Sequence, residues 1–149
     1  MKYCLGFAFS TDTHCRTYVA LIEKSKPQWQ AGKYNGIGGK IEDTDTDARA
    51  AMVREFREET GVDTDADAWK GFAVMKFWDC EVECFVGQME WEKFNSLWSP
   101  TEEQVVKVDA HKLWPFPVLP NLHWLVPMAQ AFLYQPDLRK LDIGEIIQK

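Results

Sequence analysis

REFREETGV, at residues 54–62, is the stretch of this sequence that says most about its fold. At about 100° per residue, the glutamates at positions 55, 58 and 59 project from one face of a helix. These like charges repel one another, and the helix macrodipole disfavours carboxylates near a helix C-terminus. An arrangement that is unfavourable on two counts indicates a function, such as holding a hard cation through oxygen ligands. The alternative interpretation is a solvated helix face, on which Arg54 and Arg57 offset the acids.

The helix that carries this stretch is predicted from Ala48 to Thr60. Apolar residues recur there at three- and four-residue spacing, which is the period of an amphipathic helix. Asp47 is placed to cap the N-terminus, and Gly61 is placed to end the helix.

The rest of the sequence predicts mostly strands. Residues 2–9 and 16–22 are rich in β-forming residues and are separated by a polar stretch, which predicts a hairpin. Beyond the hairpin we expect an extended segment at 29–34, two strands within 69–89, a strand at 103–108, an irregular proline-rich segment at 115–120, and helical spacing at 122–134 that Pro127 interrupts.

Length and composition predict one domain. The chain has 149 residues, of which 46% are hydrophobic and 27% charged. That size suits one core and not two, so we expect residues 1–149 to form a single domain. Strands, a helix, more strands and a second helix make an α+β fold, in which helices should cover a mixed sheet.

The charge of the chain limits its partners. Seventeen basic and 23 acidic residues give a net charge of −6, which repels nucleic-acid polymers, so no such polymer is expected as a partner. If a phosphorylated substrate binds, a divalent cation is the obvious means of cancelling the charge. No run approaches the roughly 20 apolar residues that span a bilayer, and residues 1–7 do not form a signal peptide, so we expect a cytoplasmic protein without membrane association. The four cysteines have no zinc-site spacing and are expected to be reduced thiols.

NGIGGK, at residues 35–40, is predicted to be a binding loop that precedes the acidic helix. Its glycines allow a backbone to approach a ligand closely.

GGKIE at residues 38–42, taken with REFREETGV at 54–62, resembles the signature of Nudix hydrolases, G-x5-E-x7-R-E-U-x-E-E-x-G-U, in which U is an apolar residue. The second half matches at every specified position. In the first half, counting forward from Gly39 places Asp45 where the signature has its first Glu, whereas counting back from Arg54 places Thr46 there, so the loop has one extra residue. Asp45 or Asp47 is expected to substitute for that Glu.

The resemblance implies a Nudix-type α/β/α sandwich, with a mixed sheet between helices, and an Mg²⁺-dependent hydrolase with Mn²⁺ as an alternative ion. Such enzymes cleave a nucleoside diphosphate linked to another group, by attack of water on phosphorus. The roles implied are metal binding by Glu55, Glu58, Glu59 and the carbonyl of Gly38, positioning of the carboxylates by Arg54, phosphate contact by Lys40, and support of the motif by Gly39 and Gly61.

The general base is expected either on this helix or in a distant acidic loop. Residues 99–104 are the acidic loop of this sequence, and Glu103 is the favoured further ligand or base, with Glu102 as its substitute. Glu81 and Glu83, on a strand, are weaker candidates. The catalytic residues are therefore predicted to be Glu55, Glu58 and Glu103.

Two segments are similar to the branch of the family that hydrolyses oxidised purine nucleoside triphosphates. KYNGIGGK at 33–40 is similar to that branch's W-N-G-F-G-G-K, which implies that Asn35 contacts the base edge. LPNLHW at 119–124 is similar to its W-P-D-D-x-x-W, although it is one residue shorter and places Asn121 and Leu122 where the branch has two acids. Asn121 and Trp124 are the substrate-binding residues expected on this segment.

Three functions remain open at this point. The first is hydrolysis of a nucleoside triphosphate, such as the oxidised purine nucleotide 8-oxo-dGTP, to a monophosphate and pyrophosphate by a monomer or homodimer that cleans the nucleotide pool. The second is the same chemistry on ADP-ribose, a nucleotide sugar or a dinucleoside polyphosphate. The third is a Nudix-like sensor that binds a nucleotide without cleaving it.

The acidic runs at 43–47 and 63–67 also have the opening spacing of an EF-hand calcium loop. Their sixth positions, however, are Ala48 and Ala68 in place of Gly, and their twelfth are Arg54 and Val74 in place of Glu. We therefore interpret these runs as turns and a helix cap.

Overall fold

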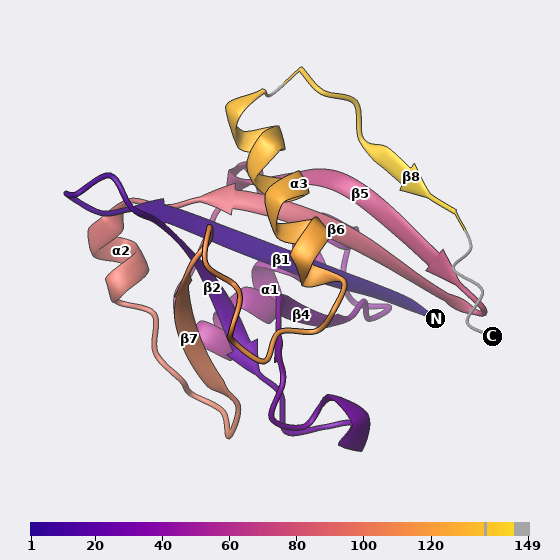
Figure 1. The fold of residues 1–149 in the computed structure, drawn as a ribbon. Helices are drawn as coiled ribbons and strands as arrows, with labels where there is room; N and C mark the ends of the chain where they lie inside the picture. Colours follow the sequence, from indigo (N-terminus) through magenta and orange to yellow (C-terminus); the bar gives the residue numbers. More distant parts are fainter. Residues whose placement is uncertain (136, 145–149) are drawn as a thin grey trace.

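The computed structural model describes residues 1–135 and 137–144 of the chain (Figure 1). In chain order its elements are β1 (Lys2–Thr11), β2 (Thr17–Glu23), the 3₁₀ turn η1 (Gln28–Gln30), β3 (Tyr34–Asn35), β4 (Ile37–Lys40), α1 (Ala48–Thr60), the 3₁₀ turn η2 (Ala66–Ala68), β5 (Trp69–Phe77), β6 (Cys80–Gln88), α2 (Trp91–Asn95), β7 (Gln104–Asp109), α3 (Leu122–Tyr134) and β8 (Leu141–Ile143). Within these residues, no helix is both long and apolar enough to cross a membrane.

The strands form one mixed sheet. Its main path runs β3-β2-β1-β6-β5-β8, with β4 paired to β1 and β7 paired to β2. The pairs β1–β6 and β5–β8 are parallel, whereas the other pairs are antiparallel. The predicted hairpin is confirmed as β1 and β2, and the two strands expected within residues 69–89 are confirmed as β5 and β6.

β1 changes its partner halfway along one edge. Its residues 3–6 pair with β4, and its residues 8–11 pair with β2. β6 lies along its other edge over residues 2–9. β4 and β2 therefore follow each other along the same edge of β1.

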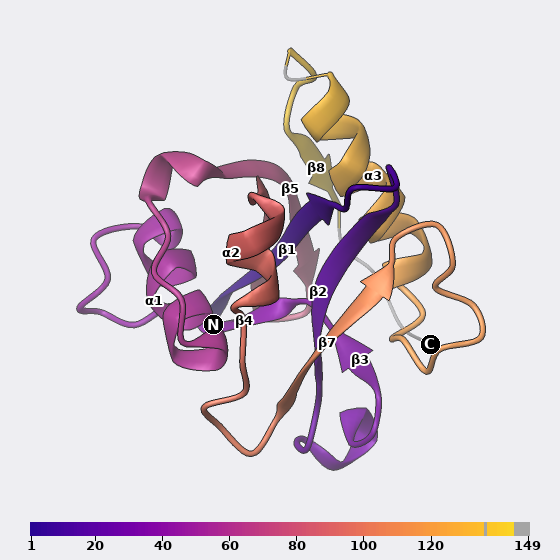
Figure 2. The ribbon, with the colours of Figure 1, turned by 90° about the vertical axis from the view of Figure 1, so that its left-hand side faces the viewer.

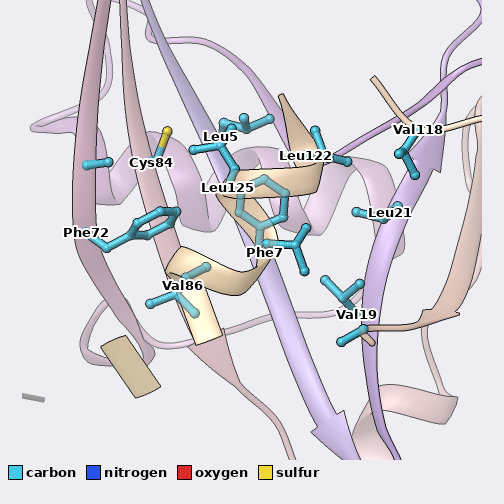
Figure 3. Close-up of a cluster of buried hydrophobic side chains, with 14 of the residues drawn as sticks. Leu5, Phe7, Val19, Leu21, Phe72, Cys84, Val86, Val118, Leu122 and Leu125 are labelled. Atoms are coloured by element: carbon cyan, nitrogen blue, oxygen red, sulfur yellow. The ribbon is translucent and has the colours of Figure 1, made fainter. Parts of the chain in front are cut away.

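Helices cover both faces of the sheet (Figure 2), with α1 and α2 on one side and α3 on the other. The core beneath α3 packs Leu125 of the helix against Phe7 and Phe72 of the strands (Figure 3). The second core packs Met52 and Phe56 of α1 against the sheet, together with Phe94 of α2 and residues of β1, β2 and β6. The α+β fold with a mixed sheet between helices is thus confirmed.

α1 has the predicted bounds, because its signals are local. The Asp47 carboxylate accepts a hydrogen bond from the Ala50 amide at 2.7 Å, which caps the first turn. Gly61 ends the helix with φ 75°, and its amide donates to the Arg57 carbonyl at 2.8 Å.

Several predicted elements are corrected. Residues 29–34 are not one extended segment, because η1 and a turn precede the two-residue strand β3. NGIGGK is not a loop, because its residues form the end of β3 and the whole of β4. The helix predicted at 122–134 is confirmed, but α3 continues through Pro127, whose missing amide removes one bond of the helix ladder. The short elements α2 and β8 were not predicted.

Candidate active site

The residues expected to bind metal, to support the motif or to act in catalysis come from four segments. β4 supplies Gly38 and Gly39, the loop at 41–47 supplies Asp45, and the last two turns of α1 supply Arg54 and the three glutamates. Glu103 ends the segment that precedes β7. α1 packs directly against β4 and β1, which brings the first three segments together.

Arg54 joins these segments through its guanidinium group. Its Nε and Nη2 donate to the two carboxylate oxygens of Asp45, at 2.9 and 2.8 Å. Its Nη1 donates to Glu55 at 3.0 Å and to Glu58 at 3.3 Å, and Nη2 also donates to the carbonyl of Lys40 at 3.1 Å. Arg54 therefore holds two of the three carboxylates by hydrogen bonds in this structure, and the positioning role that the resemblance implied for it stays a prediction.

Asp45 is the acid of the loop that pairs with Arg54. Its fork-to-fork hydrogen bonds with Arg54 lower the pKa of its carboxyl group, although partial burial opposes them. The Asp45 carboxylate also accepts from the Glu42 amide at 2.8 Å, so it ties the loop to the helix. Thr46 is exposed, and Asp47 is engaged in the helix cap, so Asp45 is the better candidate for the place of the signature glutamate, which stays a prediction.

Asp45→Asn is expected to reduce the free energy of unfolding by about 2 kcal/mol, because it leaves Arg54 without its bidentate anion in a half-buried position. Urea unfolding measures this change. Thr46→Ala is the matched control, since Thr46 is exposed, and should stay within about 0.5 kcal/mol of the parent. Equal stability of the Asp45 variant and the parent would show that this pair does not hold the loop.

Glu55 lies against the backbone of β4. A Cβ atom at Gly39 would stand 2.6 Å from the Glu55 carboxylate carbon, so any other residue here would displace this carboxylate from its present position. Burial raises the pKa of Glu55, and the neighbouring Arg54 only partly offsets that rise.

Glu59 has an unusual environment for a carboxylate. Its Oε2 is buried and has no hydrogen-bond partner among residues 1–135 and 137–144. Burial, followed by the charge of Glu103, raises its pKa to about 7. A buried carboxylate oxygen without a donor is costly, which indicates that a cationic or donor group belongs beside it.

Glu103 is held by the loop between β2 and β3. One of its oxygens accepts from the Ser25 amide at 2.5 Å and from the Ser25 hydroxyl at 3.1 Å, and the other pairs with the Lys24 ammonium at 3.3 Å. Burial favours a higher pKa, but the Ser25 amide and Lys24 outweigh it and hold the pKa of Glu103 below its usual value. Glu103 therefore remains ionised next to Glu59.

The NUDIX domain family model matches residues 7–125, which is more than half of the chain. The chain belongs to the Nudix family. In the acidic run at 43–47, Asp45 pairs with Arg54 and Asp47 caps α1, as expected of a turn and a helix cap.

Solved Nudix structures share the fold of this chain at low sequence identity. The NUDIX domain of Shewanella oneidensis NrtR, complexed with ADP ribose, has a TM-score of 0.72 at 14% identity and covers 89% of this chain and 88% of its own. For MutT from Aliivibrio salmonicida and Vibrio cholerae the TM-score is 0.66 at 17% identity, with 88% and 98% covered. For C. elegans Ap4A hydrolase it is 0.65 at 11% identity, with 89% and 97% covered. The chain spans 63% of the longer S. oneidensis NrtR structure. No curated protein matches the chain.

The Nudix carboxylates suit a hard divalent cation in type and number. All of their donor atoms are oxygens, the ligands that Mg²⁺ prefers, and Glu59 Oε2 is a buried oxygen without a partner. Over residues 1–135 and 137–144, the present side-chain positions gather no group of three metal-binding side chains, and Arg54 lies between Glu55 and Glu58. Binding of an ion would therefore require the carboxylates to lie closer together than they do in this structure.

Of the four residues expected to bind substrate, Lys40 lies at the end of β4. The other three lie on β3 and at the start of α3. The carbonyl of Lys40 accepts from Arg54, while its side chain is exposed. Asn35 uses its Oδ1 to accept from the Gly36 amide at 2.8 Å. β3 runs beside the segment before α3, since the Tyr34 amide and carbonyl bond to residues 117 and 119. Asn121 and Trp124 begin α3 just beyond this contact, so the fold brings their segment next to Asn35.

Lys24 and Ser25 were not identified from the sequence. Ser25 contacts a carboxylate 78 residues further along the chain, and nothing in the local sequence of either segment indicates this pairing. The lysines of residues 24–33, a segment without acidic residues, could have indicated an electrostatic contact with an acidic segment, but not with which one.

The metal-free protein is expected to gain stability as the pH falls from 8 to 6. Because the pKa of Glu59 is raised to about 7, its protonated form favours the folded state; this contribution is complete below its ordinary pKa and is lost as the pH rises through 7. The gain should be about 1 kcal/mol, or about 3 °C in Tm. Thermal unfolding in EDTA measures it, and Glu59→Gln should flatten the dependence. An unchanged slope in that variant would mean that another group titrates.

Proposed function

We propose that this chain is a Mg²⁺-dependent Nudix pyrophosphohydrolase that converts a nucleoside triphosphate to a nucleoside monophosphate and pyrophosphate. The observation that supports this best is the buried, unpartnered Oε2 of Glu59 beside the ionised Glu103. A chain selected for stability alone would replace such a carboxylate, whereas a cation-dependent hydrolase requires it.

The ligand set follows from the donors present. Glu55, Glu58, Glu59 and the carbonyl oxygen of Gly38 would hold the ion, and Glu103 is either a further ligand or the base. When bound, Mg²⁺ neutralises charge on phosphate oxygens and lowers the pKa of water. Arg54, fixed by Asp45, orients Glu55 and Glu58, and the exposed Lys40 side chain contacts a phosphate.

Hydrolysis also requires a proton acceptor. The water oxygen forms a bond to phosphorus, the bond from phosphorus to the departing pyrophosphate oxygen breaks, and the water proton passes to a carboxylate. We favour Glu103, because Ser25 and Lys24 keep it ionised and fixed while lone pairs remain on both of its oxygens. Glu58, which is exposed and bonded only to Arg54 in the described residues, is the acceptor on the helix.

For the base, we propose an oxidised purine such as that of 8-oxo-dGTP. Since Asn35 Oδ1 is used by the Gly36 amide, its Nδ2 is the group left to donate to an oxygen on the base. Trp124, 39% exposed, offers a face for stacking, and Asn121, whose side chain makes no capping bond, can contact the base edge.

A substrate panel tests the proposal. The purified chain, as a monomer or homodimer, is incubated with Mg²⁺ or Mn²⁺ and with 8-oxo-dGTP, dGTP, ADP-ribose, a nucleotide sugar or Ap4A, and the products are separated. Pyrophosphate and a monophosphate from 8-oxo-dGTP are expected. Preferential cleavage of ADP-ribose or Ap4A would replace the substrate while keeping the chemistry, and tight binding without any product would identify a sensor.

A further inference from the structure

Residues 24–41 differ in charge from the rest of the chain. They include four lysines and no acidic residue, in a protein with a net charge of −6. Three of the lysines, Lys24, Lys26 and Lys33, belong to the loop at 24–33, which we call the lysine loop. Such a segment makes the electrostatic potential locally positive next to an acidic site.

The lysine loop is closed on itself. The Lys24 amide donates to the Lys33 carbonyl at 2.8 Å, and the Gly32 amide donates to the Lys24 carbonyl at 2.8 Å. The η1 turn fills its middle, where the Gln30 amide donates to the Pro27 carbonyl at 2.9 Å. The loop is therefore a defined projection whose Lys26 and Lys33 side chains are exposed.

The lysine loop is also fixed beside the candidate catalytic carboxylates. Ser25 and Lys24 bind both oxygens of Glu103, and the charges of Glu103 and Lys24 both act on Glu59. Lys26 follows Ser25 directly, and Lys33 lies opposite Lys24 at the neck of the loop. Both exposed ammonium groups thus belong to the segment that is anchored at Glu103.

We propose that the lysine loop binds the terminal phosphates of the substrate, on the side that leaves as pyrophosphate; this inference rests on the proposed function of the same site. Where no cation covers them, the carboxylates repel the phosphate groups of the substrate. In this proposal, the ammonium groups of Lys26 and Lys33 bind the terminal phosphates. A nucleic-acid polymer would meet the acidic surface beyond this short segment, whereas a phosphate chain is small enough to contact the lysine loop alone.

The test uses inorganic tripolyphosphate as the probe, by isothermal titration calorimetry at low ionic strength, with and without Mg²⁺. The double variant Lys26→Gln/Lys33→Gln should bind it about fivefold more weakly than the parent, from two exposed charge contacts. The matched control Lys76→Gln/Lys93→Gln removes two exposed lysines on β5 and α2 and should bind within twofold of the parent. Trp29, 65% exposed in the same loop, gives a second readout, because its fluorescence should change on binding and Trp29→Phe should remove that change.

The outcomes separate this inference from the proposed function. Equal affinity of the two double variants, or no binding by the parent, would overturn the lysine loop as a phosphate site even if the chain hydrolyses nucleotides. A selective loss in Lys26→Gln/Lys33→Gln supports it even if every nucleotide in the panel is left uncleaved. In an active protein, the same variant should raise KM for the triphosphate with little change in kcat.

Discussion

Glu59→Gln is expected to lower kcat by about 10³-fold, which corresponds to about 4 kcal/mol of lost transition-state stabilisation. The amide has the shape of the carboxylate but no charge, so it fills the same space and cannot serve as an anionic ligand. Its NH₂ group can donate to a neighbouring carboxylate, which gives the buried and unpartnered Oε2 position a hydrogen bond. The metal-free variant should therefore be at least as stable as the parent.

Glu58→Gln should lose activity to a similar degree, because Glu58 is expected to contact the same ion. Both variants are compared with Glu92→Gln, which makes the same chemical change on an exposed residue of α2. Turnover is measured under single-turnover conditions with the preferred nucleotide, and folding by circular dichroism. Activity that survives in both helix variants would remove these glutamates from the mechanism.

Gly38→Ala is expected to lower the free energy of unfolding by at least about 3 kcal/mol. A Cβ at this position would lie far inside contact distance of the Cys4 carbonyl oxygen, which belongs to the backbone of the adjacent strand β1. Backbone in the middle of a sheet cannot move aside as a side chain can. The β1–β4 pairing must therefore open, which should appear in urea unfolding and in the yield of soluble protein.

Two other glycines serve as controls for Gly38. Gly144→Ala should change stability little, because a Cβ there meets nothing within 4 Å. In Gly39→Ala the new methyl group meets the Glu55 carboxylate instead of backbone, so activity should fall more than stability does. If Gly38→Ala is as stable as Gly144→Ala, the close approach of β4 to β1 is not required for folding.

The sequence predicted both ends of α1 correctly, because the signals for a helix lie within it and at its ends. β4 was predicted as a loop for the opposite reason. Two of its four residues are glycines, which have low strand propensity, and its strand character comes from pairing with residues 3–6, more than 30 positions away. α2 has only five residues and no side-chain cap, so packing of Phe94 stabilises it more than any local preference.

The candidate site was predictable to the same extent. Arg54 and the three glutamates lie within one helical motif, so their proximity follows from the helix period. The attachment of Glu103 to Ser25 depends on how β7 pairs with β2, which no local pattern specifies. Asn35 and Asn121 belong to adjacent segments, and their contact with a base stays a prediction.

The pairing of Asp45 with Arg54 has a consequence for how such chains are recognised. Aspartate is one methylene shorter than the glutamate of the signature, and here the segment that joins it to the helix arginine is one residue longer, yet its carboxylate accepts two hydrogen bonds from that arginine. A sequence motif with a fixed number of residues between its conserved positions does not match such a segment. A template that requires an acid able to form a fork with the helix arginine, whatever the number of intervening positions, would retain it.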